Sequence, residues 1–110
     1  MPSVEDVLAV QFEAYRTNEP EVVWAKIEAN HQVGDLVTGR IAARFPFGLA
    51  IDFGAEFPGM LLGTRIPDMT AEELQQNTKF ATGSIVTARI ERFATTARQI
   101  GLTQLGDSTV

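Results

Sequence analysis

A two-residue alternation of apolar and polar side chains is the feature that most constrains how this chain can fold. Downstream of Gly34 it recurs in four runs, and a shorter apolar run lies between the second and the third of them. The four runs cover residues 37–44, 49–53, 86–91 and 99–103, and the shorter one covers 59–62. Alternation of this period places every second side chain on one face of a β-strand. The sequence therefore predicts five half-buried strands in this part of the chain.

Glycines punctuate these runs in the way that small closed barrels require, because glycine supplies the bends and bulges that coil barrel strands. They stand at Gly39, Gly48, Gly54, Gly59, Gly83 and Gly101. Thr70 and Glu73 form a capping box, which predicts a short helix over about 71–78, between the third and fourth strands. This layout is typical of the oligonucleotide-binding (OB) fold. We therefore expect a five-stranded antiparallel OB-fold barrel over residues 33–105.

The start of the chain follows a helical pattern instead. Apolar residues recur there at steps of three and four, which predicts one buried face of a helix over about 4–16. Ser3 and Asp6 resemble a capping box at its beginning. The apolar face consists of Val4, Val7, Leu8, Phe12 and Tyr15.

A second helix is expected to begin with Asn18 as its cap and Pro20 in its first turn, and to end near Asn30. Val23, Trp24 and Ile27 give this helix an apolar stripe. We expect a helical hairpin with Trp24 buried against the barrel or the first helix. Three parts of the chain are thus predicted: an acidic helical extension over 1–32, the barrel over 33–105 and a frayed tail over 106–110.

Five segments resemble, in the right order, the strands of the S-one RNA-binding domain, the repeat of the small-subunit ribosomal protein S-one. They read VGDLVTGRI (33–41), PFGLAIDF (46–53), GMLL (59–62), TGSIVTARI (82–90) and RQIGLT (98–103). WAKIEA (24–29) resembles the helical connector of multi-repeat members, although one repeat follows it here. The match covers about 70 of the 110 residues. The resemblance implies an OB-fold barrel that binds single-stranded RNA.

Three positions depart from the family's pattern. Ala50 stands where the family has an aromatic residue, Leu62 where it has an RNA-contacting histidine, and Ala94 where it has an aspartate. Base stacking on aromatic side chains contributes about 1–3 kcal/mol per base in proteins that bind single strands. The departures therefore predict a barrel that keeps the fold and binds RNA weakly.

Aromatic and arginine side chains are the candidates for contacting RNA. Phe47, in the first turn, is a candidate stacking platform beside Arg44, with packing at the barrel rim as an equal alternative. For Phe45, packing at the rim is the favoured interpretation. A cationic stripe can form from Arg40, Arg44, Arg65, Arg89, Arg92 and Arg98. Strand parity predicts outward side chains for Arg40, Arg44 and Arg89. The alternative is a solvated surface balanced by Glu56, Asp68 and Glu91. The residues that we predict to bind RNA are Phe47, Arg44, Arg40, Arg65, Arg98 and Phe45.

Negative charge is concentrated at the start of the chain, whose net charge is −5. Residues 1–34 carry six acidic and two basic side chains, whereas residues 35–110 carry eight acidic and seven basic ones. Six of those seven are arginines, which fork onto phosphates and stack on bases. We therefore expect weak, salt-sensitive RNA binding, with a shallow slope of log affinity against log salt. Removal of residues 1–30 should strengthen this binding, because it removes negative charge.

No residue pattern favours catalysis. His31 is the single histidine, and a metal site or a catalytic triad needs several placed partners, so capping of the second helix is its favoured role. Glu72 and Glu73 are adjacent on a helix and point to different faces. The chain has no cysteine and no phosphate-cradling glycine loop. We expect no enzymatic activity, no cofactor and no metal.

The sequence shows no secretory signal and no apolar stretch of about 18 residues, so we expect a soluble protein with no membrane contact. The lack of cysteine fits a reducing cytoplasm. A protein-interaction module on a degenerate S-one-like fold is the alternative function. Its partner would bind the N-terminal helices through Val4, Leu8, Phe12 and Tyr15. A small hydrolase is a third, weaker alternative, because no catalytic constellation supports it.

Overall fold

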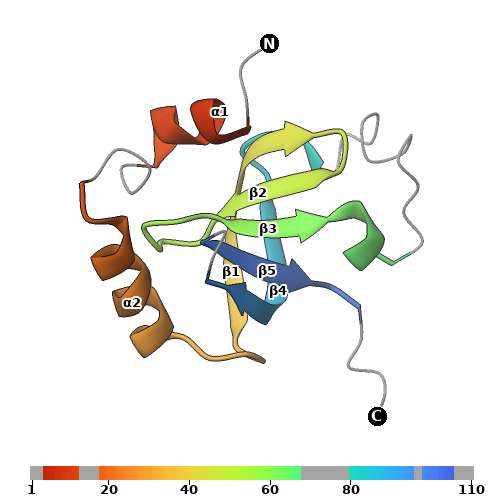
Figure 1. Ribbon diagram of the computed structural model, residues 1–110. Helices are drawn as coiled ribbons and strands as arrows, with labels where there is room; N and C mark the ends of the chain where they lie inside the picture. Colours follow the sequence, from red (N-terminus) through yellow and green to blue (C-terminus); the bar gives the residue numbers. More distant parts are fainter. Residues whose placement is uncertain (1–3, 13–17, 68–79, 96–97, 106–110) are drawn as a thin grey trace.

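A computed structural model describes residues 4–12, 18–67, 80–95 and 98–105 of the chain (Figure 1). Two helices precede a barrel of five strands, and a 3₁₀ helix, η2, directly follows the third strand. In chain order the elements are α1 (Val4–Gln11), α2 (Pro20–Asn30), β1 (Leu36–Phe45), β2 (Gly48–Asp52), β3 (Gly59–Leu62), η2 (Gly63–Arg65), β4 (Ile85–Ala94) and β5 (Gln99–Thr103). The five strands fall where the alternation predicts them.

The strands close into a barrel in the order β1-β2-β3-β5-β4, which confirms the predicted OB-fold barrel. Four of the five strand pairs are antiparallel, and the β3–β5 pair is parallel. A closed ring with an odd number of strands cannot alternate direction throughout, so one parallel pair is unavoidable. The antiparallel arrangement predicted from the sequence therefore holds everywhere except at the closing pair.

β1 is long enough to pair with β4 along its first half and with β2 along its second half. A bulge between Ile41 and Ala43 interrupts the second pairing. A bulge adds a residue to one strand and so changes which side chains face inward. Ile41 therefore points into the barrel core, and Ala43, two residues further on, packs into a separate cluster on the outer surface.

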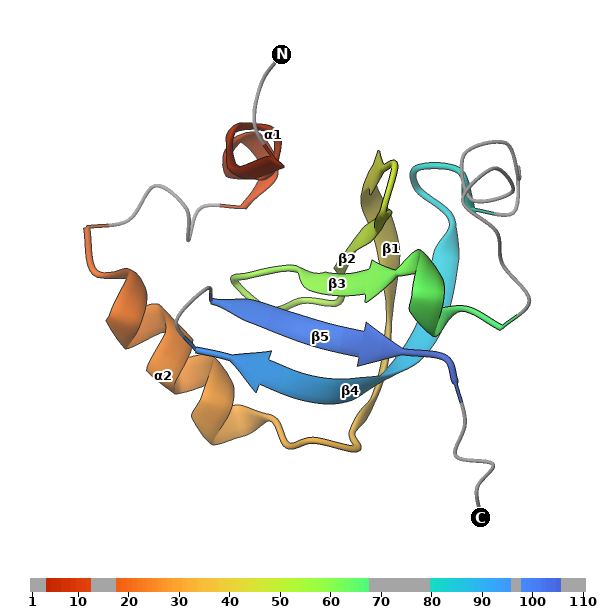
Figure 2. The ribbon, with the colours of Figure 1, turned by 45° about the vertical axis from the view of Figure 1, so that its right-hand side comes forward.

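α2 closes one end of the barrel. Trp24 and Ile27 are 3% and 1% exposed and belong to the main core. The Trp24 ring meets Phe57 and Phe93 edge-on, with ring centroids 5.8 and 6.0 Å apart. Figure 2 shows α2 alongside the end of β4 and the beginning of β5. The predicted burial of Trp24 is confirmed, and the barrel is what buries it.

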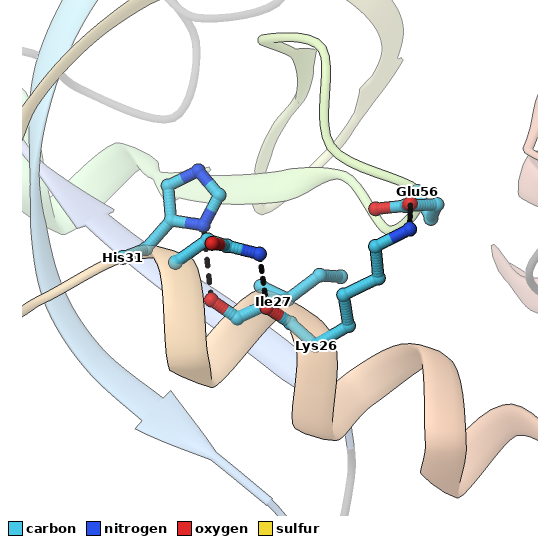
Figure 3. A network of polar contacts seen from close by, with 5 residues as sticks. Lys26, Ile27, His31 and Glu56 are labelled. Atoms are coloured by element: carbon cyan, nitrogen blue, oxygen red, sulfur yellow. Dashed lines mark hydrogen bonds and ion pairs between the residues drawn. The ribbon is translucent and has the colours of Figure 1, made fainter.

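The C-terminal end of α2 is capped as the sequence predicts. His31 follows the last helical residue, and its Nδ1 lies 3.0 Å from the Ile27 carbonyl oxygen (Figure 3). A carbonyl oxygen can only accept a hydrogen bond, so Nδ1 is the donor. The same ring meets Phe53 edge-on at 5.7 Å. Lys26 Nζ lies 3.8 Å from a carboxylate oxygen of Glu56, so this ion pair joins α2 to the β2–β3 loop.

The N-terminal end of α2 differs from the prediction by one residue. Pro20 is the first helical residue, so the capping position falls on Glu19 and not on Asn18. No side-chain hydrogen bond caps this end of the helix. Proline fits here because the first turn needs no N–H donor.

α1 packs on the outside of the barrel, away from α2 (Figure 1). The buried side chains of the two helices join different clusters, so the helices do not form the packed hairpin that we predicted. The reason is that the apolar face of α1 finds its partner on the outer surface of the sheet. α1 ends at Gln11, and the rest of the predicted helix, with Tyr15, lies outside the described residues.

Two other predictions, the helix over 71–78 and the tail over 106–110, also fall outside the described part of the chain. Neither helix in the described residues has the length and apolar character that crossing a membrane requires.

Candidate nucleic-acid interface

A row of directly paired residues crosses the outer surface of all five strands. Ala43 of β1 pairs with Ala50 of β2, which pairs with Met60 of β3; Met60 pairs with Gly101 of β5, and Gly101 pairs with Arg92 of β4. Residues directly opposite each other on neighbouring strands point to the same face of a sheet. We call these five residues the outer row. With about 4.8 Å between neighbouring strands, the row is about 20 Å long.

The β1 end of the outer row lies beneath α1. Leu8 and Phe12 pack against the first three residues of the row, and Val7, Ala42 and Phe45 lie at the edge of this cluster. Ala50, the position at which the S-one family has an aromatic residue, is fully buried here. Two small alanine side chains leave room for the helix to pack on the sheet.

The β1–β2 turn carries an aromatic pair beside the row. The rings of Phe45 and Phe47 are parallel within 4°, with centroids 5.3 Å apart. Phe45 lies between Phe47 and the α1 cluster, whereas Phe47 is 46% exposed. An exposed ring that is supported from behind is a suitable platform for a nucleobase.

The backbone holds this turn against the third strand. The Phe47 carbonyl oxygen accepts a hydrogen bond from the Gly63 N–H at 2.9 Å. Gly48 permits the approach, because a Cβ atom at this position would lie 2.6 Å from the Leu61 carbonyl oxygen. Since Gly63 begins η2, the same contact brings the aromatic pair close to Arg65, the last residue of that helix.

A small groove lies at the β4 end of the outer row. Its lining includes three residues of the outer row, which are Met60, Gly101 and Arg92, together with Leu62, Arg65, Glu91 and Gln99. Arg65 Nε donates a hydrogen bond to a Glu91 carboxylate oxygen at 2.9 Å. The stem of Arg92 lies across Gly101, where an added Cβ would be 2.9 Å from the Arg92 Cγ atom. Two guanidinium groups and one carboxylate therefore gather beside the apolar part of the row.

The structure brings together three of the six residues that we predicted to bind RNA. Phe45, Phe47 and Arg65 lie on one side of the barrel. Arg44 pairs with Leu49, and the Leu49 side chain is in the barrel core. The Arg44 side chain therefore points to the opposite face from Phe45, the next residue of the strand. The bulge at Ala42 reverses the outward parity that the sequence predicted for Arg44.

Arg40 and Arg98 also lie away from the aromatic pair. Arg40 is on the β1–β4 surface, where it pairs with Ile85 and donates a hydrogen bond to the Gly83 carbonyl oxygen at 3.4 Å. Arg98 is in the β4–β5 turn and forms an ion pair at 3.8 Å with Glu21 of α2. The arginines therefore do not form a single cationic stripe.

Arg92, Met60 and Gln99 are interface candidates that our sequence-based set omits. Arg92 belongs to the broader group of arginines, but nothing in the sequence distinguished it from the others. What distinguishes Arg92 is that it lies opposite Gly101 on the neighbouring strand. This pairing is visible only when the register of β4 and β5 is known, and that register shifts between Ile90 and Arg92. Within the described residues, no three histidine, cysteine, aspartate or glutamate side chains are placed to hold a metal ion.

Solved structures share this barrel. RNase R from Mycoplasma genitalium matches in its apo form, with a TM-score of 0.59 and 20% identity over 76% of this chain. It also matches in a complex with ribose-methylated single-stranded RNA, with a TM-score of 0.61 and 19% identity over 80% of this chain. In both cases this chain spans 15% of the RNase R chain.

Two smaller proteins match over most of the same region. An uncharacterized protein, MJ1198, from Methanocaldococcus jannaschii has a TM-score of 0.55 and 14% identity, and the match covers 71% of this chain and 97% of that one. GSP13 from Bacillus subtilis has a TM-score of 0.56 and 13% identity, and the match covers 73% of this chain and 64% of the GSP13 chain. No protein-family model and no curated protein matches the sequence. Likeness at these identities establishes a shared fold, and the S-one resemblance stays a prediction.

Proposed function

We propose that this chain binds single-stranded RNA weakly, on the outer surface of the barrel, and has no catalytic activity of its own. The observation that carries the proposal is the exposed Phe47 ring, stacked on Phe45 and placed next to a groove that holds Arg65 and Arg92. The ring offers a stacking surface, and each guanidinium group can bind a phosphate or lie flat on a base.

The comparison with RNase R supports this choice of ligand. That protein has been solved in a complex with single-stranded RNA, and it shares the barrel over most of this chain. OB-fold barrels use the strand 2–3 face and the loops around it for oligonucleotides. In this chain the corresponding surface contains Phe47 and the middle of the outer row.

Binding is weak in this proposal because the described surface offers one exposed aromatic platform and few cations. One stacked base contributes about 1–3 kcal/mol. Because Glu91 already pairs with Arg65, the groove can neutralise one to two phosphates, which gives a slope of log affinity against log salt of about −0.7 to −1.4 for a single strand. The slope is shallow compared with that of a strongly basic RNA-binding protein.

A titration of a fluorescein-labelled oligouridine of about ten nucleotides, at low and moderate salt, tests the proposal. Phe47→Ala should weaken binding by about 5- to 150-fold, from the loss of one stacked base. Leu36→Ala is the matched control, because Leu36 is a similarly exposed apolar residue on the β1–β4 surface. Equal affinity of the two variants, or no binding at high micromolar protein and low salt, would contradict the proposal.

A pair of charge-removing variants locates the interface. Arg92→Ala and Arg40→Ala each remove one positive charge from an exposed side chain, but from different surfaces of the barrel. We expect Arg92→Ala to weaken binding several-fold more than Arg40→Ala does. Equal effects would mean that long-range charge, and not contact at the groove, governs the affinity.

The alternative, a protein-interaction module, has support on another surface. Leu8 and Phe12, through which we predicted a protein partner to dock, are buried against the barrel, and the side chains of Val4 and Tyr15 lie outside the described part. Two exposed apolar residues instead lie at opposite ends of the β1–β4 pairing, where Leu36 is 60% and Ile85 58% exposed. A groove next to Leu36 continues this surface toward Leu105.

A further inference from the structure

The outer row is covered at its β1 end by a helix of the same chain. Leu8 and Phe12 of α1 are 2% and 4% exposed, and they lie on the first three residues of the row. Gln11 donates a hydrogen bond from its side-chain amide to the Ala42 carbonyl oxygen at 2.9 Å. α1 therefore covers a surface that borders both the Phe45–Phe47 pair and, through Met60, the Arg65–Arg92 groove, the two parts of the proposed RNA interface.

α1 is built so that it can leave this surface without opening the barrel. It has eight residues, and an isolated helix of that length is marginal in water, so its docked state depends on the contacts of its apolar face. Its buried side chains belong to the α1 cluster on the outer surface of the sheet and not to the main core. Val10, on the other side of the helix, is 79% exposed. Release of α1 therefore exposes the row and leaves the core packing intact.

The covered surface has the chemistry of a nucleobase-binding surface. Ala43 and Ala50 make it flat and apolar, the Phe45 ring borders it on one side, and Met60 connects it to the groove, because Met60 belongs both to the α1 cluster and to the groove lining. We propose that α1 and single-stranded RNA compete for the outer row, so that bases replace Leu8 and Phe12 when RNA binds. This inference rests on the proposed RNA binding and adds an intramolecular competitor to it.

The docked state of α1 has a small net stability. Burial of one leucine and one phenylalanine side chain favours it, and the conformational entropy lost in ordering an eight-residue helix opposes it. RNA can thus displace α1, and it binds with an apparent affinity reduced by the fraction of molecules in which α1 is docked. Competition of this kind weakens RNA binding independently of the negative charge of the N-terminal residues.

A pair of uncharged substitutions on the two faces of α1 tests the competition. Leu8→Ser removes a docking contact, and Val10→Ser makes a similar change on the exposed face of the helix. Neither changes the net charge, so a difference between them cannot come from electrostatic attraction. We expect Leu8→Ser to bind the labelled oligouridine about tenfold more tightly than the unaltered chain, and Val10→Ser to bind it equally well.

Hydrogen exchange shows independently whether α1 has been released. The Phe12 amide donates to the Leu8 carbonyl oxygen at 2.8 Å and should be protected while α1 is docked. This protection should be lost in Leu8→Ser and kept in Val10→Ser, while Trp24 fluorescence stays native in both. Unchanged RNA affinity in a Leu8→Ser chain that has lost this protection would overturn the competition and leave the proposed function standing.

A chain with α1 locked in place gives the opposite test. Cysteines introduced as Gln11→Cys and Ala42→Cys can be joined by a short bifunctional thiol reagent, and the chain contains no other cysteine to react. The joined chain should bind the oligouridine at least tenfold more weakly than the same variant before joining. Equal affinity before and after joining would overturn the competition. Failure of every variant to bind RNA would overturn the proposed function as well.

Discussion

The two N-terminal helices contact the barrel in different ways. α2 places Trp24 and Ile27 in the main core. It also forms ion pairs with the barrel, between Glu21 and Arg98 and between Lys26 and Glu56. Near its C-terminal end, Glu28 accepts a hydrogen bond from the Thr95 hydroxyl at 3.1 Å. α1 lies on the outer surface of the sheet, where Leu8 and Phe12 cover small side chains. One helix completes the fold, and the other covers a surface that the fold does not need to bury.

This difference separates stability from binding within a small domain. The β4–β5 turn, which oligonucleotides can use in OB folds, is bridged to α2 by Thr95 and Arg98. The surface near the β1–β2 turn carries the exposed Phe47 and a covering helix that can move. We therefore expect substitutions at α2 to change the free energy of unfolding, and substitutions at α1 to change RNA affinity.

Trp24→Ala should produce the largest change. Removal of a buried aromatic side chain from the main core should lower the free energy of unfolding by about 3–5 kcal/mol. Val22→Ala, at an exposed position of the same helix, should change it by about 0.5 kcal/mol or less. Urea denaturation followed by far-UV circular dichroism measures both. A loss of about 1 kcal/mol or less for Trp24→Ala would show that α2 is not part of the core.

Leu8→Ala should have a smaller effect, although Leu8 is as deeply buried as Trp24. We expect a loss of about 1–2 kcal/mol, because α1 can detach and no cavity has to remain in the barrel. Val10→Ala is the control on the exposed side of α1. A loss equal to that of Trp24→Ala would remove the distinction between the two helices.

His31→Ala should lower the free energy of unfolding by about 1 kcal/mol, since it removes the hydrogen bond to the Ile27 carbonyl oxygen and the edge contact with Phe53. Gln32→Ala, at the next and exposed position, is the control. If both substitutions have the same effect, the cap does not contribute to the attachment of α2.

Lys26→Ala should have the smallest effect, about 0.5 kcal/mol or less, because Lys26 and Glu56 form an exposed ion pair at 3.8 Å. The small loss should disappear in about 1 M salt, where charges are screened over about 3 Å. A large loss that persists in high salt would show that Lys26 contributes by packing and not by charge.

The sequence was sufficient for the fold and for the role of α2. Four period-two runs and one short apolar run locate the five strands of the described residues, and the Trp24 stripe predicts a buried helix face. Both follow from local patterns of burial, which a sequence records directly. The placement of α1 could not be predicted, because an apolar stripe shows that a helix face is buried but not which surface buries it.

The candidate site was predicted in part, and the failures at Arg44 and Arg92 come from strand register. The bulge at Ala42 adds one residue to β1, and this reverses the direction of Arg44 relative to simple alternation. Arg92 becomes a candidate once Gly101 is known to lie beside it. Side-chain direction and cross-strand neighbours depend on register, which the alternation pattern alone does not fix.

The most direct test of the account is a methyl and indole NMR titration of the full chain with the oligouridine. Met60 lies between the α1 cluster and the groove, and Trp24 is the residue of α2 whose ring lies in the main core, so each helix has its own reporter. We expect the Met60 methyl signal to shift and the Phe12 amide to lose its protection as RNA is added, while the Trp24 indole signal stays in place. A shift of the Trp24 signal with an unchanged Met60 signal would contradict the account, because RNA would then bind at the end of the barrel that α2 closes.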